Sequence, residues 1–236
     1  MTTQGRFSAA LAAEYTQGKA AVIPDIKCIS PKEGDLLRGR DPLEIAEHLV
    51  SWGAPALSVV TECEHFGGSP ELLHAITKRV GVPTLRKDFI KTCEQLDETM
   101  QLGAAAVLLI VANIDADTLS LLYKHAVQIG LEPLIEVCAA EEMTLAKDLG
   151  AKLIGINNRN IMTLELDDGG VERTAKLTQL APANALLVSE SGILSAEDAK
   201  QALRAGAHAV LVGTALWQAE DMGAMYQKFQ EAVCFE

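Results

Sequence analysis

The sequence predicts an α/β protein, a single (β/α)8 TIM barrel over residues 1–236 with a short N-terminal helical extension. Three observations support this fold class. A unit of glycine, small residues and an apolar strand recurs along the chain, and helix-like segments separate the units. The recurrence is even, and no glycine-rich dinucleotide motif or P-loop follows the first strand, which favours the barrel over a doubly wound sheet.

The predicted strands are near-continuous apolar runs, as is typical of a parallel sheet covered by helices. In chain order they are "AAVIPDIK" (20–27), "GAPALSVV" (53–60), "GVPTLRKD" (81–88), "GAAAVLLI" (103–110), "GLEPLIEV" (130–137), "GAKLIGIN" (150–157), "NALLVSES" (184–191) and "GAHAVLVG" (206–213). These eight runs account for every strand that the barrel requires.

Helical periodicity is clearest in "DPLEIAEHLVSWG", "SPELLHAITKRVG", "SLLYKHAVQIG" and "SAEDAKQALRAG". Several begin with Ser or Asp and end on Gly, which we expect to take a positive φ before the next strand. Ahead of the first strand, Phe7, Leu11 and Tyr15 form an apolar stripe at helical spacing. This extension either caps the barrel or plugs its bottom, and we favour the cap.

The composition restricts the partners of the protein. A net charge of −12 and a pI near 4.9 argue against binding nucleic acid or an anionic membrane surface, so an anionic ligand would need a locally basic site. Five cysteines without a C-x-x-C motif, no signal peptide and no long apolar run predict a reduced, cytoplasmic, soluble protein. The five histidines are scattered, so we expect no metal. No dinucleotide fingerprint or cofactor lysine motif stands out, so we expect no cofactor either.

Polar side chains lie at or just after the carboxyl ends of most of the predicted strands. They are Asp25 and Lys27, Glu62, Lys87, Glu136, the run Asn157, Asn158 and Arg159, and finally Glu190 and Ser191. The carboxyl ends of barrel strands meet at one face, where active sites lie. Desolvating such a cluster costs several kcal/mol per ion unless pairing or function offsets the cost. The pattern therefore indicates a catalytic site.

The last two strands predict a phosphate site. "ESGI" and "LVGTAL" place Gly192 and Gly213 beside Ser191 and Thr214, where we expect helices to begin. Backbone N–H groups at a helix N-terminus bind phosphate, and barrels commonly do so after strands seven and eight.

The motifs "IKCISPKEG", "HFGGSPELL", "PTLRKDFI", "PLIEV", "GINNRN", "SESGI" and "AVLVGTAL" resemble, in this order, the indole-3-glycerol phosphate synthase family. The resemblance runs from about Ile23 to Leu216. It implies a carboxy-lyase of tryptophan biosynthesis that uses no cofactor. Its substrate would be a small anionic phosphosugar-anthranilate, 1-(2-carboxyphenylamino)-1-deoxyribulose 5-phosphate, which closes its ring with loss of carbon dioxide and water.

The resemblance also implies roles for single residues. Lys87 would be the general acid, Glu136 the general base and Lys27 the second catalytic lysine, while Asn157, Glu190 and Ser191 would position the substrate and the lysines. The expected substrate-binding residues are Asp25, Ser30, Phe66, Phe89, Arg159, Ser191, Gly192, Gly213 and Thr214, with Ser30 and the last three holding phosphate.

Strand one departs from the family pattern, which usually reads Glu-x-Lys-Arg. Here Asp25 and Cys28 replace the Glu and the Arg, so we expect Asp25 to orient Lys27 less well and to lower activity. Two alternatives stay open. One is an isomerase like phosphoribosylanthranilate isomerase, which uses a strand-one cysteine, although alternation places Cys28 on the face opposite Lys27. The other is a weakened phosphate-ligand-binding barrel.

Overall fold

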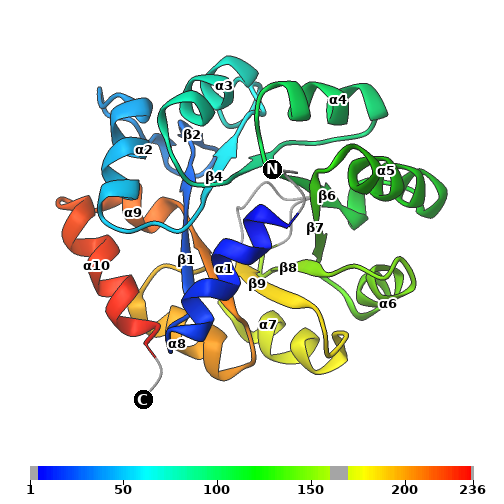
Figure 1. The fold of residues 1–236 in the computed structure, drawn as a ribbon. Helices are drawn as coiled ribbons and strands as arrows, with labels where there is room; N and C mark the ends of the chain where they lie inside the picture. Colours follow the sequence, from blue (N-terminus) through cyan, green and yellow to red (C-terminus); the bar gives the residue numbers. More distant parts are fainter. Residues whose placement is uncertain (1–4, 160–169, 235–236) are drawn as a thin grey trace.

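The computed structural model describes residues 5–159 and 170–234, and in them eight parallel strands close into a barrel (Figure 1). All eight predicted strands are confirmed. They are β1 (Ala21–Ile26), β4 (Leu57–Val60), β5 (Thr84–Lys87), β6 (Ala106–Ile110), β7 (Glu132–Val137), β8 (Leu153–Asn157), β9 (Leu186–Glu190) and β10 (Ala209–Val212). Neighbours in sequence are neighbours in the sheet, and β1 closes the barrel by pairing with both β4 and β10.

Helices form an outer ring around this barrel (Figure 1). They are α2 (Pro42–Ser51), α3 (Pro70–Arg79), α4 (Cys93–Gln101), α5 (Ala116–Ile129), α6 (Ala140–Asp148), α7 (Glu172–Leu177), α8 (Ala196–Arg204), α9 (Thr214–Gln218) and α10 (Met222–Ala232), with short 3-10 turns at Val111–Asn113 and Thr178–Leu180. Side chains at the N-caps, such as Asp41 and Ser69, accept backbone N–H groups of the first turn. Within the described residues, no helix is long and apolar enough to cross a membrane.

The expected glycine caps are confirmed with one exception. Gly53, Gly103, Gly130, Gly150 and Gly206 all take a positive φ between a helix and the following strand. The prediction is wrong at Gly81, because the C-cap of α3 is Val80, which is already extended (φ −93°, ψ 143°). The chain leaves this helix directly into an extended path, so no left-handed residue is needed there.

Alternation along the strands separates two cores. Ile23 of β1 belongs to the cluster inside the barrel, whereas Val22 and Ile26 pack outward against helices. Asp25 and Lys27 continue the inward face of Ile23 and line cavities at the carboxyl end of the barrel. The inward face therefore changes along β1 from apolar at the bottom to charged at the mouth.

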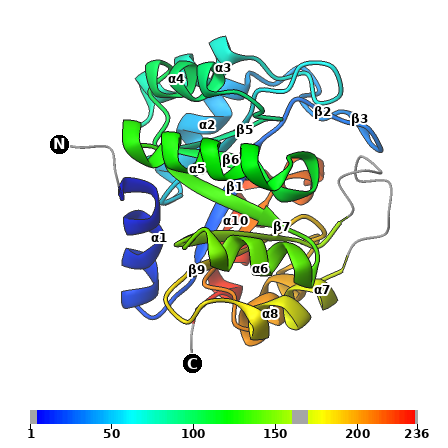
Figure 2. The same cartoon turned by 90° about the vertical axis from the view of Figure 1, so that its right-hand side faces the viewer.

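The N-terminal helix α1 (Arg6–Thr16) lies across the bottom of the barrel, so the favoured prediction of a cap over the mouth was wrong. Phe7 and Leu11 are buried in the cluster inside the barrel. At the start of β7, a carboxylate oxygen of Glu132 accepts the Phe7 N–H at 2.6 Å. Figure 2 shows α1 and the small hairpin of β2 (Ile29–Ser30) and β3 (Gly34–Asp35) at opposite ends. Phe7 and Leu11 of the apolar stripe pack against the apolar bottom layer of the barrel, whereas Tyr15 is exposed.

Candidate active site

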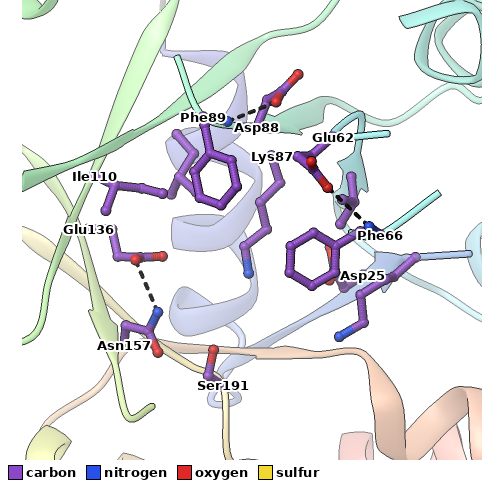
Figure 3. Close-up of a pocket in the computed structure, with 13 residues that line it drawn as sticks. Asp25, Glu62, Phe66, Lys87, Asp88, Phe89, Ile110, Glu136, Asn157 and Ser191 are labelled. Carbon is purple, nitrogen blue, oxygen red and sulfur yellow. Dashed lines mark hydrogen bonds between the residues drawn. The ribbon is translucent and has the colours of Figure 1, made fainter. Parts of the chain in front are cut away.

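A cavity of about 430 Å³ opens at the carboxyl ends of the strands (Figure 3). It is lined by Asp25, Lys27, Val60, Glu62, Phe66, Lys87, Asp88, Phe89, Leu108, Ile110, Glu136, Asn157 and Ser191. Aromatic and aliphatic side chains thus share the cavity with two lysines and several carboxylates. An apolar pocket with a few convergent polar groups is the usual form of a small-molecule site.

Lys87 is the last residue of β5, and its side chain points into the cavity (Figure 3). Its ammonium Nζ lies 3.1 Å from Oε2 of Glu190, at the end of β9. The Glu190 side chain has no exposed surface. A fully buried carboxylate is stable only beside a cation or when protonated, so this ion pair fixes both side chains.

Glu136 lies near the end of β7 and is buried in the wall of the same cavity. Asn157 of β8 donates a hydrogen bond from Nδ2 to Oε1 of Glu136 at 3.0 Å (Figure 3). Burial, and secondly the charge of Glu190, raise the pKa of the Glu136 carboxyl to about 8, against the opposing effects of Lys87 and Asn157. At neutral pH this carboxyl therefore holds its proton in much of the population.

The second lysine, Lys27, lies over an aromatic ring. Its Nζ is 5.6 Å from the ring centroid of Phe66, a cation–π arrangement. Phe66 is held by its backbone N–H, which donates to a carboxylate oxygen of Glu62 at 3.0 Å. This contact places one cation and one aromatic face on the same side of the cavity.

Asp25 forms no ion pair within the described part of the chain, so the orienting contact expected between it and Lys27 is not made there. Oδ1 of Asp25 is buried and has no hydrogen-bond partner among the described residues. Its other oxygen, Oδ2, lies next to the backbone of Gly213 at the start of α9. The shared strand face puts the two side chains in one cavity, but the short Asp25 side chain lies toward β10.

A second cavity of about 350 Å³ adjoins the first. It is lined by Asp25, Lys27, Lys87, Arg159, Ser191, Gly192, Ile193, Leu194, Leu211, Gly213 and Thr214. Asp25, Lys27, Lys87 and Ser191 line both cavities. Three cations and two glycine turns surround this space, so it has the chemistry of an anion site in a protein of net charge −12.

The two glycine turns of this second cavity differ. Gly213 is the N-cap of α9, which begins at Thr214 as predicted. The corresponding prediction at Gly192 was wrong, because α8 begins only at Ala196. Ser191 and Gly192 instead take φ values of 60° and 70°, a left-handed turn that directs both residues into the cavity wall.

Ser30 is the predicted binding residue that lines neither cavity. It lies on β2, and its hydroxyl oxygen accepts the Glu33 N–H at 3.4 Å. Cys28 also lines neither cavity, as strand alternation predicted. The cysteine on which the isomerase alternative depends is therefore placed away from the site.

Several residues that support the site were missed from the sequence. Arg86 is buried behind Lys87 and donates to Thr61, Asp88 and Glu98, at 3.0, 3.1 and 2.6 Å. A charged residue inside the apolar run "TLRKD" was the available signal, since a buried arginine requires acceptors. These bonds connect the end of β5 to Thr61 after β4 and to Glu98 on α4. They also join Arg86 and Asp88, the residues before and after Lys87 in the sequence.

One group of possible metal ligands lies at the rim. Atoms of Glu62, Glu64 and His65 are within 4.8 Å of one another. The Glu62 carboxylate accepts the backbone N–H groups of Glu64, His65 and Phe66, and a bond from Nδ1 of His65. These bonds use the carboxylate to close the turn after β4, so we assign no metal to this group.

The fold and the site together define a (β/α)8-barrel enzyme with a lysine–carboxylate ion pair beside a cavity lined by cations and glycine turns. A family model described as indole-3-glycerol phosphate synthase matches residues 1–229. The chain belongs to this family.

Proteins from archaea and bacteria support this membership. An indole-3-glycerol phosphate synthase of Pyrococcus abyssi is 45% identical over 214 residues, which cover 91% of this chain and 93% of the relative. The enzyme of the same name from Carboxydothermus hydrogenoformans is 43% identical over 215 residues, 91% of this chain and 80% of the relative. Indole-3-glycerol phosphate synthase 1 of Streptomyces coelicolor is 44% identical over 200 residues, 85% and 73% of the two chains.

The position of Asp25 leads to a first prediction. Replacing Asp25 with Glu adds one methylene and extends the carboxylate farther into the space between the two cavities. We expect kcat to rise, by at most about a hundredfold, because a displacement of about 1 Å at an active site has effects of that order. Steady-state kinetics of the Asp25→Glu and Asp25→Asn variants test this, with Asn as the control that removes only the charge. An unchanged or lower kcat for Asp25→Glu would show that Asp25 does not limit the reaction.

Proposed function

We propose that this protein closes the ring of 1-(2-carboxyphenylamino)-1-deoxyribulose 5-phosphate to give indole-3-glycerol phosphate, carbon dioxide and water. The observation that carries the proposal is the position of Lys87. Its ammonium faces the cavity, is paired with buried Glu190 at 3.1 Å, and shares the cavity wall with Glu136. Family membership supplies the reaction, and this geometry supplies the groups that the reaction needs.

The two cavities match the two ends of the substrate. Phe66, Phe89 and Ile110 give the first cavity the apolar walls that an aromatic ring needs, with Lys27 beside them for the carboxylate. Arg159 and the turns of Gly192 and Gly213 surround the second cavity, where we place the phosphate. Lys87 lines both cavities, so the carbonyl that joins the two ends of the substrate would lie within its reach.

The reaction needs an acid first. Lys87 donates its proton toward the ketone oxygen, and the ring carbon that bears the carboxylate attacks the carbonyl carbon. A carbon–carbon bond forms and the ketone becomes a hydroxyl group. The carboxylate then leaves as carbon dioxide, and its bonding electrons restore the aromatic ring.

Dehydration completes the product. The hydroxyl leaves as water with a proton from a lysine, and Glu136 accepts the proton that the intermediate loses as the double bond forms. Lys27 is placed over Phe66 to hold the carboxylate before it leaves. Glu190 keeps Lys87 charged between proton transfers, because the ion pair stabilises the ammonium form.

A fluorescence assay tests the proposed function. The purified protein is mixed with the carboxyphenylamino substrate, and formation of indole-3-glycerol phosphate is followed by its fluorescence. We expect turnover. Isomerisation of phosphoribosylanthranilate without activity on the later substrate would favour the isomerase alternative, and tight binding without turnover would favour a phosphate-ligand-binding barrel. Either result would overturn the proposal.

The raised pKa of Glu136 predicts the pH dependence of the reaction. A carboxyl that acts as a base must lose its proton first, so kcat/KM should increase as the pH rises from 6 and level off above about 8. Asn157→Ala removes the hydrogen bond that lowers this pKa, so it should move the rise to higher pH. Initial rates from pH 6 to 9 test both statements. A flat profile for the unmodified protein would contradict the assignment of Glu136 as the base.

A further inference from the structure

A glycine on β8 lies between the strands that carry Glu136 and Glu190. Gly155 is in register with Glu136 on β7 and with Val188 on β9, so it lies at the same level of the barrel wall as the base. Figure 1 shows β8 directly between β7 and β9. Position 155 is therefore adjacent both to the strand that carries Glu136 and to the strand that carries Glu190.

The space beside Gly155 is occupied by the Glu190 carboxylate. A Cβ atom at position 155 would lie 2.2 Å from Oε1 of Glu190 and 3.3 Å from its carboxyl carbon. The first distance is far shorter than any van der Waals contact, so Glu190 could not keep its position beside alanine. Gly155 does not have a left-handed φ, so alanine is compatible with its backbone. Overlap with Glu190 is thus the main obstacle to a side chain here.

Glu190 has little freedom to move elsewhere. Its side chain has no exposed surface, and the chain on either side of it is attached to β8. Asn158 donates from Nδ2 to the backbone oxygens of Glu190 and Ser191, both at 3.1 Å. A carboxylate displaced from the Gly155 space would therefore change its geometry to Lys87 instead of turning into solvent.

We propose that Gly155 is a positioning residue for the acid–base chemistry, because the missing side chain provides the space from which the Glu190 carboxylate reaches Lys87. The inference rests on the proposed function where its test measures kcat. It rests on the geometry alone where its test measures the distance between Glu190 and Lys87. Gly155 lines neither of the two cavities. It acts on Lys87 through Glu190, whose oxygen lies 3.1 Å from the Lys87 ammonium.

A double-mutant cycle tests this coupling. Gly155→Ala is made in the natural chain and in the Glu190→Asp variant, whose shorter side chain places its oxygens about where the Glu190 carboxyl carbon now lies, 3.3 Å from the added Cβ. We expect Gly155→Ala alone to lower kcat by about ten- to a hundredfold with little change in KM. In the Glu190→Asp background the same substitution should change kcat by less than about twofold.

Gly81→Ala is the matched control. Gly81 is exposed, has nothing within 4 Å of an added Cβ and lies at the opposite end of the barrel, before β5. We expect it to leave kcat unchanged. Equal losses from Gly155→Ala in both backgrounds, or full activity of Gly155→Ala, would overturn the proposal.

Two further readouts separate this inference from the proposed function. A crystal structure of Gly155→Ala should show the Glu190 carboxylate more than about 4 Å from the Lys87 ammonium, instead of the present 3.1 Å. An unmoved ion pair would overturn the inference whatever reaction the protein catalyses. If Gly155→Ala does not fold, the Gly155→Ala/Glu190→Asp variant should fold, because the overlap is gone. Failure of both variants to fold would also overturn it.

Discussion

Replacing Lys87 with alanine is expected to lower kcat by at least about a thousandfold. The substitution removes the proposed general acid from the cavity that Glu136, Phe66 and Ser191 also line (Figure 3). It also leaves the Glu190 carboxylate without the ammonium 3.1 Å away, in a position with no exposed surface.

The fluorescence assay measures this effect, and Lys91→Ala provides the matched control. Lys91 follows β5 in the same connection to α4, but its side chain is exposed and lines neither cavity. We expect Lys91→Ala to keep normal kcat. The thermal unfolding midpoint of Lys87→Ala shows whether the variant is folded. Full activity in a folded Lys87→Ala variant would disprove the assignment of Lys87 as the general acid.

The second large effect concerns Glu136, the proposed general base. Glu136→Gln keeps the size of the side chain and an oxygen that can accept the Asn157 hydrogen bond, but it removes the group that accepts a proton. We expect kcat to fall by about a hundredfold to ten-thousandfold. The rise in kcat/KM between pH 6 and 8 should disappear in the residual activity, because Glu136 is the group whose raised pKa produces it.

Stability provides an independent readout of the same carboxyl. The pKa of Glu136 is raised from an ordinary 4.5 to about 8 in the folded protein, so the folded state holds a proton that the unfolded chain releases. The free energy of unfolding should therefore fall as the pH rises from about 5 to 8. Thermal unfolding midpoints of Glu136→Gln should decline less over this range than those of the natural chain. Parallel declines of the unfolding midpoint in the variant and in the natural chain would show that the pKa of Glu136 is not raised in this way.

Much of the fold and part of the site could be predicted from the sequence. Each apolar run became a barrel strand, because a parallel sheet covered by helices leaves an unmistakable pattern of short buried segments. The convergence of Lys87, Glu136 and Asn157 followed from topology, since the carboxyl ends of barrel strands meet at one face whatever their distance in sequence.

Contacts between strands could not be predicted in this way. Alternation placed Asp25 and Lys27 on one face, but their separation depends on side-chain direction, and the short Asp25 side chain lies beside Gly213. The motif "SPKEG" suggested a phosphate ligand, yet Ser30 bonds within its own hairpin. Local sequence contains no information about which partner on another strand a polar atom will meet.

The sequence by itself determined the eight-unit barrel, the face on which its chemistry lies and the residues that meet there. Periodicity and strand alternation are local properties, and they set which side chains point inward. Only the tertiary structure decided that α1 covers the bottom of the barrel, that Glu190 pairs with Lys87, and that Gly155 leaves room for this pair. These features depend on distances between segments far apart in the chain, where a few ångströms separate an ion pair from an overlap.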